Sequence, residues 1–188
     1  MRDQLMTNKK SKNSKEKILN SAIYLFSQKS FADVSIRDIA KEAAVSPALI
    51  YKYFDNQQHL HMTALKIEAK KLISELNTAH SLEQLVETYL HHMYKKDMLY
   101  QMMAYSMLEM RSTQKIATPL EETIEIIKMF EAALPKHFST NRKQQAQLLF
   151  STLNGLLITY KNYASYSEEK AFEHILLLSN EYISLLIK

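Results

Sequence analysis

Residues 35–54 read SIRDIAKEAAVSPALIYKYF and predict two short helices joined by a tight turn. The first helix begins at Ser35, whose hydroxyl can cap a free amide while Asp38 completes a capping box. The second begins at Ser46, with Pro47 at the first helical position, where a missing N–H costs nothing. Two helices joined by so short a turn must cross steeply. The segment therefore predicts a helix-turn-helix whose second helix can enter a DNA major groove about 12 Å wide.

The two helices divide their side chains between an inner and an outer face. Apolar residues recur at helical spacing and predict the inner face, at Ile36, Ile39, Ala40, Ala43, Val45 and Ile50. On the outer face, Tyr51 and Tyr53 suit DNA phosphates, and Lys52 suits a base edge or a phosphate. Leu49 suits either packing or contact with a thymine methyl. The predicted DNA-binding residues are Ser35, Arg37, Ser46, Pro47, Ala48, Leu49, Tyr51, Lys52 and Tyr53.

The region from Ser14 to Leu60 resembles the DNA-binding domain of the tetracycline-repressor (TetR) family. The matching segments are KEKILNSAIYLFSQKSF, VSIRDIAKEAAVSPALIYKYF and DNQQHL. Four positions depart from the family pattern, with Ser30, Ala44 and Ala48 in place of the usual glycines and Gln57 in place of a lysine that commonly reaches a phosphate. Ala44 would need a left-handed or strained turn geometry at a cost of about 1–2 kcal/mol. The resemblance implies a homodimeric repressor that binds palindromic operator DNA and is released by a small hydrophobic or amphipathic effector.

The positive charge is concentrated in the same part of the chain. Residues 1–60 hold ten lysines and arginines against six acidic residues, a net charge of +4, which equals the formal net charge of the whole chain. Basic side chains release counterions from phosphates, which gives salt-sensitive affinity for nucleic acid. Residues 1–13 are polar and without periodicity, so we expect a flexible basic arm that either tracks phosphates or serves only solubility.

Composition narrows the fold and the chemistry. One glycine, three prolines and 46% hydrophobic residues leave little material for strand turns, so we predict an all-α protein. The absence of cysteine excludes disulfides and cysteine-based metal sites. We expect no cofactor and no metal, because neither His91 with His92 nor His59 with His61 has the i, i+4 spacing of a ligand clamp. With no long apolar run and no signal peptide, we expect a cytoplasmic protein without a membrane partner.

Beyond Leu60 the sequence predicts a succession of helices, about nine in the whole chain. They begin near Asn56 and Ser81 and then span roughly 97–110, 118–134, 140–163 and 168–187. We predict a flexible arm over 1–13, a DNA-binding domain over 14–60 and a helical regulatory and dimerisation domain over 61–188.

Methionine and tyrosine are unusually frequent over residues 89–110. Methionine adapts to irregular space, and tyrosine offers an apolar face with a polar tip. The cluster predicts either a pocket for a small effector or a methionine-rich core. The candidate ligand-binding residues are Tyr89, Met93, Met102, Met103, Tyr105, Met107 and Met110.

The last two predicted helices are apolar on more than one face. One side can pack within the chain, so we expect the other to meet a second copy. The resemblance likewise implies a homodimer held by a four-helix bundle. Gly155, the single glycine, lies inside the first of the two, where it permits a close helix approach or is merely tolerated. The candidate dimer residues are Leu149, Leu153, Gly155, Leu156, Tyr160, Ile175, Leu178 and Tyr182.

Three alternatives to a ligand-released repressor stay open at this point. One is a ligand-independent DNA-binding protein, and another is a regulator that ligand activates. The third and remotest is a helical enzyme. A single glycine leaves no phosphate-cradling loop, and no nucleophile–base pair has supporting context, so we predict that the protein is not an enzyme.

Overall fold

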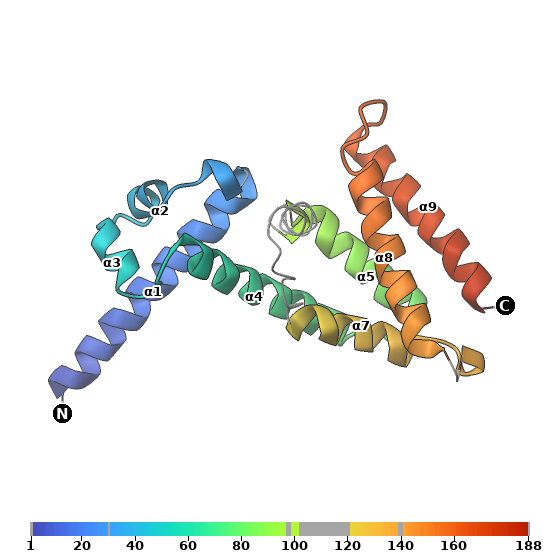
Figure 1. Ribbon diagram of the computed structural model, residues 1–188, viewed down its shortest axis with the longest axis horizontal. Coiled ribbons are helices and arrows are strands. Elements are labelled where there is room, and N and C mark those ends of the chain that lie inside the picture. The colour runs from blue at the N-terminus through green and yellow to red at the C-terminus, as the bar shows by residue number, and fades with distance from the viewer. Residues whose placement is uncertain (1, 30, 97–98, 102–120, 139–140, 188) are drawn as a thin grey trace, which may run out of the picture. The chain divides into compact units, whose positions relative to one another are not determined.

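The computed structural model describes residues 2–29, 31–96, 99–101, 121–138 and 141–187, with side chains from Asn13 onward. The helices among these residues are α1 (Arg2–Gln28), α2 (Ile36–Glu42), α3 (Pro47–Tyr51), α4 (Gln57–Leu76), α5 (Leu82–Lys95), α7 (Glu121–Ala133), α8 (Arg142–Tyr160) and α9 (Glu168–Ile187), with 3-10 turns at Phe31–Asp33 and Lys136–Phe138 (Figure 1). No strand occurs in any of the described ranges, which confirms the predicted all-α fold. The helix predicted over 97–110 lies outside the described residues, apart from 99–101, which are helical.

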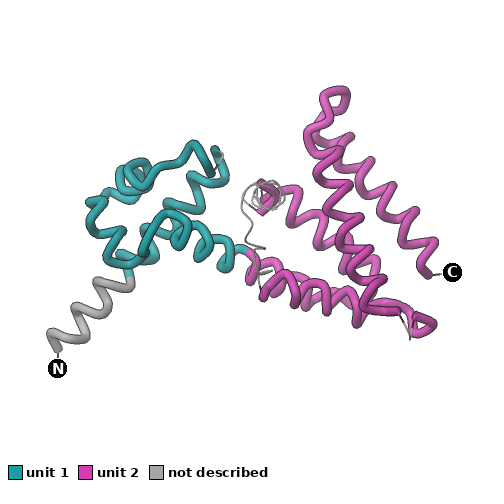
Figure 2. The backbone as a smooth tube through the Cα atoms, in the orientation of Figure 1, with its two compact units in different colours: residues 1–68 teal, residues 69–188 magenta. Residues whose placement is uncertain are grey.

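The chain divides into two compact units, residues 1–68 and 69–188 (Figure 2). The division falls inside α4, eight residues beyond the predicted limit at Leu60. The helix starts where Asn56 Oδ1 accepts a hydrogen bond from the N–H of His59 at 2.8 Å. No glycine or proline follows before Leu76, so no residue marks the boundary in the sequence.

Unit 1 builds the helix-turn-helix on a small apolar core. In it, α1 packs on α2 and α2 packs on α3. The fully or almost fully buried side chains include Ile18, Ala22, Phe26, Val34, Ile39, Ala40, Ala43, Ile50, Phe54, Leu60 and Ala64. The inward residues predicted from helical spacing thus form this core, except Val45, which is half-buried.

The helix α1 is longer than the sequence predicts. Its backbone is helical from Arg2, within the residues 1–13 that are expected to form a flexible basic arm. No proline or glycine interrupts residues 2–13, so a helix nucleated further along can extend backward residue by residue. The flexibility of this basic arm and its role in tracking phosphates stay predictions.

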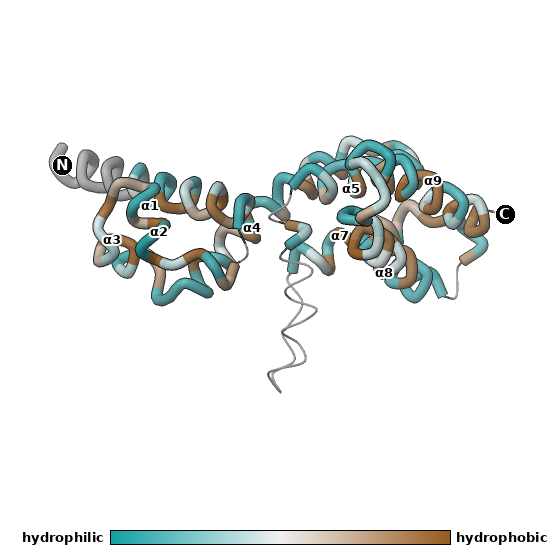
Figure 3. The backbone as a smooth tube through the Cα atoms, turned by 90° about the horizontal axis from the view of Figure 1, so that it is seen from above, coloured by the Kyte–Doolittle hydropathy of each residue, from teal (hydrophilic) through white to brown (hydrophobic). Residues whose placement is uncertain are grey.

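Unit 2 is a helical bundle in which α8 packs on α7 and α9, and α5 packs on α7, α8 and α9. The predicted apolar stripe of α5 is buried throughout, at Leu82, Leu85, Val86, Tyr89, Leu90 and Met93. Hydrophobic residues lie along both α8 and α9 (Figure 3). Among the described helices, none has the length and apolarity that a membrane span requires.

Candidate nucleic-acid interface

The start of α2 is fixed by the predicted capping box. Ser35 Oγ accepts from the Asp38 N–H at 3.2 Å, and Asp38 Oδ2 accepts from the Ser35 N–H at 2.9 Å and from its hydroxyl at 2.6 Å. These hydrogen bonds, chiefly the one from the Ser35 hydroxyl, lower the pKa of the Asp38 carboxyl below its usual value. The polar atoms of Ser35 are therefore committed to positioning α2, and Arg37 is the exposed basic residue of its first turn.

The turn between α2 and α3 is a Schellman motif. The N–H of Val45 donates to the carbonyl of Ala40 at 2.9 Å, and that of Ala44 donates to Lys41 at 3.1 Å. Ala44 has φ of 50°, the left-handed conformation that the sequence predicts for this position. The motif closes α2 abruptly and sends the chain at once into α3.

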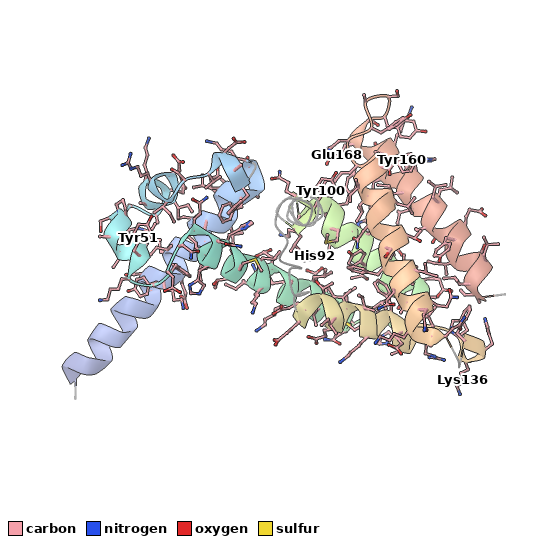
Figure 4. The ribbon with its side chains drawn as sticks, in the orientation of Figure 1. Tyr51, His92, Tyr100, Lys136, Tyr160 and Glu168 are labelled. Atoms are coloured by element: carbon pink, nitrogen blue, oxygen red, sulfur yellow. The ribbon has the colours of Figure 1, made fainter. Side chains whose placement is uncertain are left out.

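The reading helix α3 is held from its inner side. Ser46 Oγ accepts from the N–H of Leu49 at 3.3 Å, which confirms the predicted N-cap. Ile50 and, after the helix, Phe54 are fully buried. The outer face is thereby left to exposed residues, with Tyr51 56% exposed (Figure 4). The exposed members of the predicted DNA-binding set are Ser35, Arg37, Ser46, Pro47, Ala48, Tyr51 and Lys52, and the half-buried members are Leu49 and Tyr53.

Gln57 has a role that the sequence does not reveal. Its Nε2 donates a hydrogen bond to the carbonyl oxygen of Val34, in the segment that precedes α2. Gln57 stands where the family usually has a lysine that contacts a phosphate. Its side chain instead joins the start of α4 to the segment before α2. An exposed cation near the end of the helix-turn-helix is Lys15 on α1. Its Nζ lies 5.5 Å from the centroid of the Phe54 ring.

The predicted ligand-binding residues are only partly within the described structure. Tyr89 and Met93 are buried side chains of α5, and the phenol of Tyr89 donates to Asn154 Oδ1 at 2.5 Å. Met102, Met103, Tyr105, Met107 and Met110 lie outside the described residues. Sequence reasoning missed Asn154, although a polar residue within the apolar run LLFSTLNGLL was a usable signal.

The predicted dimer residues separate into two groups. Leu149, Leu153 and Ile175 are fully buried within their own chain, so they cannot reach a second copy; the prediction is wrong for these three. Gly155 is exposed, and a Cβ placed on it would meet nothing within 4 Å. The half-buried members are Leu156, Tyr160, Leu178 and Tyr182. Helical periodicity identified the apolar helices without telling which face meets a neighbour in the same chain.

The helix-turn-helix also matches a known protein family. A family model described as "Bacterial regulatory proteins, tetR family" matches residues 18–61, which include α2, α3 and the start of α4. The Bacillus subtilis (strain 168) protein named "Probable HTH-type transcriptional regulator YttP" is 37% identical over 81 residues, 39% of this chain and 39% of that protein. An uncharacterized HTH-type transcriptional regulator of Mycobacterium tuberculosis (strain H37Rv) is 34% identical over 61 residues, 32% of this chain and 30% of that protein. The chain thus aligns with well under half of the length of either relative.

Solved structures resemble the chain over most of its length. A transcriptional regulator from Aquifex aeolicus VF5 has a TM-score of 0.68 and 22% identity, and the match covers 92% of this chain and 98% of that one. A TetR-family transcriptional regulator from Streptomyces coelicolor has a TM-score of 0.66 and 16% identity, with coverage of 94% and 87%. At these identities the likeness shows a shared fold.

Proposed function

From the premise that this chain belongs to the TetR family of bacterial regulatory proteins, we propose that it is a homodimeric transcriptional repressor released from operator DNA by a small effector. Its site of action is the cytoplasm, where the DNA is. The observation that carries the proposal is the outer face of α3, where Ala48, Tyr51 and Lys52 are exposed while Ile50 and Phe54 are buried. Phenols and a lysine on a short, firmly capped helix suit phosphate and base-edge contacts in a major groove.

Charge supports the same assignment. The net charge of +4 lies within residues 1–60, and the remaining residues have equal numbers of basic and acidic side chains. A basic domain beside a nearly neutral one directs DNA toward the helix-turn-helix through counterion release.

A homodimer fits the surface of the last two helices. Leu148 and Ile158 on α8 are 54% and 40% exposed, and Leu177 and Leu185 on α9 are 57% and 68% exposed. Leu148, Ser151, Gly155 and Ile158 recur at three- and four-residue spacing, so they form one exposed stripe of α8. A second copy packing on these residues would bury them, and open Gly155 would permit close approach. The resulting twofold dimer would present two α3 helices to half-sites about 34–36 Å apart, or a multiple of this spacing.

Release by an effector requires a conformation that binds the effector well and the operator poorly. Because α4 runs without interruption across the boundary between the two units, it is the proposed lever that transmits the change. The coupling is reciprocal, so effector and operator must each weaken binding of the other by the same factor.

The proposal is tested by selecting bound fragments from sheared genomic DNA. We expect the wild type to enrich sequences that contain an inverted repeat, including DNA close to its own gene. The Tyr51→Ala, Lys52→Ala double variant should enrich none, because it removes the exposed phenol and the only cation of α3 and its C-cap. Tyr163→Ala, Lys128→Ala removes an exposed phenol and a cation from unit 2 and serves as the matched control. Equal enrichment by both double variants would exclude α3 as the reading helix.

A further inference from the structure

Three polar side chains of unit 2 are more than nine-tenths buried and each retains an unpaired polar atom. They are Glu122 on α7 with its Oε2, Asn154 on α8 with its Nδ2, and His92 on α5 with its Nε2. Their exposed fractions are 5%, 1% and 4%. Nearly all buried polar groups in folded proteins have a hydrogen-bond partner, and each missing partner is costly. Three such groups in one bundle therefore point to a partner that the chain itself does not supply.

Contacts between aromatic rings connect α7 to the Tyr89–Asn154 pair. Glu122, Ile126 and Phe130 are the buried residues of α7 and recur every four residues, so they form one stripe. The ring centroid of Phe130 lies 5.6 Å from that of Tyr89 on α5. The Tyr89 hydroxyl donates to Asn154 Oδ1, which fixes the amide and leaves its N–H groups free. Phe130, two turns along the stripe that begins with Glu122, thus contacts the Tyr89 ring.

The third group, His92, is oriented by a neighbour on another helix. Its Nδ1 lies 2.7 Å from Oε2 of Glu75 on α4, so Nδ1 donates to the carboxylate and Nε2 is left unpaired. His92 lies one turn beyond Tyr89 near the end of α5, and Glu122 is the second residue of α7.

The charge of Glu122 selects the chemistry of the partner. A carboxylate only accepts hydrogen bonds, and a buried one needs an opposing charge. Among the residues with described structure, no lysine or arginine pairs with Glu122. An ammonium group would supply both charge and donors, whereas a ligand carboxylate would be repelled.

We propose that Glu122 binds the effector, and that the effector is an amphipathic organic amine. Its cationic nitrogen donates to Glu122 Oε2, and its apolar part lies against the buried stripe that Ile126 continues one turn along α7. The inference rests on the proposed release by an effector and names the chemical class of that effector.

Binding of matched probes to the full-length protein tests this assignment by isothermal titration calorimetry. Phenylbutylamine, phenylbutanol and phenylbutyrate share one apolar body and differ in the charge of the headgroup, and octylamine, octanol and octanoate form a second set. In at least one set, we expect the amine to bind the wild type about 10-fold or more tightly than the alcohol and the acid. No preference for an amine in either set would overturn the proposal.

Two isosteric variants test whether Glu122 causes the preference for an amine. Glu122→Gln should abolish it, while Glu121→Gln, the exposed neighbour in the same helical turn, should retain it. Because the wild-type carboxylate has an unpaired buried oxygen, Tm of Glu122→Gln should equal or exceed that of the wild type. A preference that survives in Glu122→Gln, or a clearly lowered Tm, would contradict the assignment, since a structural carboxylate destabilises the fold when replaced.

Operator binding separates failure of this assignment from failure of the proposed function. If an amine binds through Glu122 but leaves operator affinity unchanged, the amine-binding site is supported and release by an effector is contradicted. If another compound releases operator equally from the wild type and from Glu122→Gln, the repressor function is supported and the assignment of Glu122 is contradicted.

Discussion

At the scale of single residues, Ala44 carries backbone strain at the turn of the helix-turn-helix. Its φ of 50° places an L side chain in the left-handed region, where only glycine is free of steric cost. We predict that Ala44→Gly raises the free energy of unfolding by up to about 1 kcal/mol, because relief of strain exceeds the added entropy of the unfolded chain. Urea denaturation checks it, with Ala48→Gly, inside α3, as a control that should be destabilising by about 1 kcal/mol. A loss of stability in Ala44→Gly would contradict the account.

His61 gives unit 1 a dependence on pH. Its ring centroid lies 3.9 Å from that of Phe31 and 4.5 Å from that of Phe26, and burial lowers its pKa to about 4. Between this value and about 6.5, the unfolded chain binds a proton that the folded chain does not. Stability should therefore fall as the pH decreases from about 6.5 to 4, by up to about 3 kcal/mol.

The contribution of His61 is isolated by comparing the wild type with His61→Gln, which does not titrate. Unfolding free energies at neutral pH and at about pH 4.5 should differ less in the variant than in the wild type. Identical pH dependence in both proteins would assign the acid sensitivity to other groups.

At the scale of elements, the Tyr89–Asn154 hydrogen bond links α5 to α8. Burial raises the pKa of the Tyr89 phenol, so the hydroxyl remains protonated and can donate. Tyr89→Phe leaves Asn154 Oδ1 buried without a donor, and we predict a loss of about 1–3 kcal/mol in the free energy of unfolding. Tyr163→Phe, at an exposed tyrosine, should change it little. If Tyr89→Phe leaves the free energy of unfolding unchanged, Asn154 must find another hydrogen-bond donor.

Sequence predicts the starts of helices well because caps are local. The side chains of Ser35, Ser46, Asn56 and Ser81 all accept from an amide three residues further on, as their spacing predicts. Contacts between residues far apart in the sequence are harder to predict from it. Gln57 binds a carbonyl 23 residues away, and the burial of Leu149 and Ile175 depends on neighbouring helices that periodicity does not identify. The start of α1 at Arg2 has no local signal, because residues 2–13 are polar and show no apolar periodicity.

At the scale of the whole molecule, the exposed leucines of α8 and α9 are the proposed dimer surface. Introducing buried like charges there is costly, so Leu148→Glu, Leu177→Glu should convert a dimer into monomers and weaken operator binding. Sedimentation equilibrium measures the mass directly. Ile124→Glu, which changes an exposed apolar residue of α7, should remain dimeric. A double variant that stays dimeric would place the interface elsewhere.

The central claim is that the outer face of α3, within a basic domain, binds DNA. The most direct measurement is fluorescence anisotropy of a selected DNA fragment at roughly 50–200 mM salt, a range over which phosphate contacts weaken strongly. We predict that wild-type affinity falls steeply with salt. The Tyr51→Ala, Lys52→Ala variant should bind more weakly at every salt concentration, with a slope reduced by about one for each lost lysine contact. Wild-type affinity that is independent of salt, or a double variant that binds like the wild type, would contradict the account.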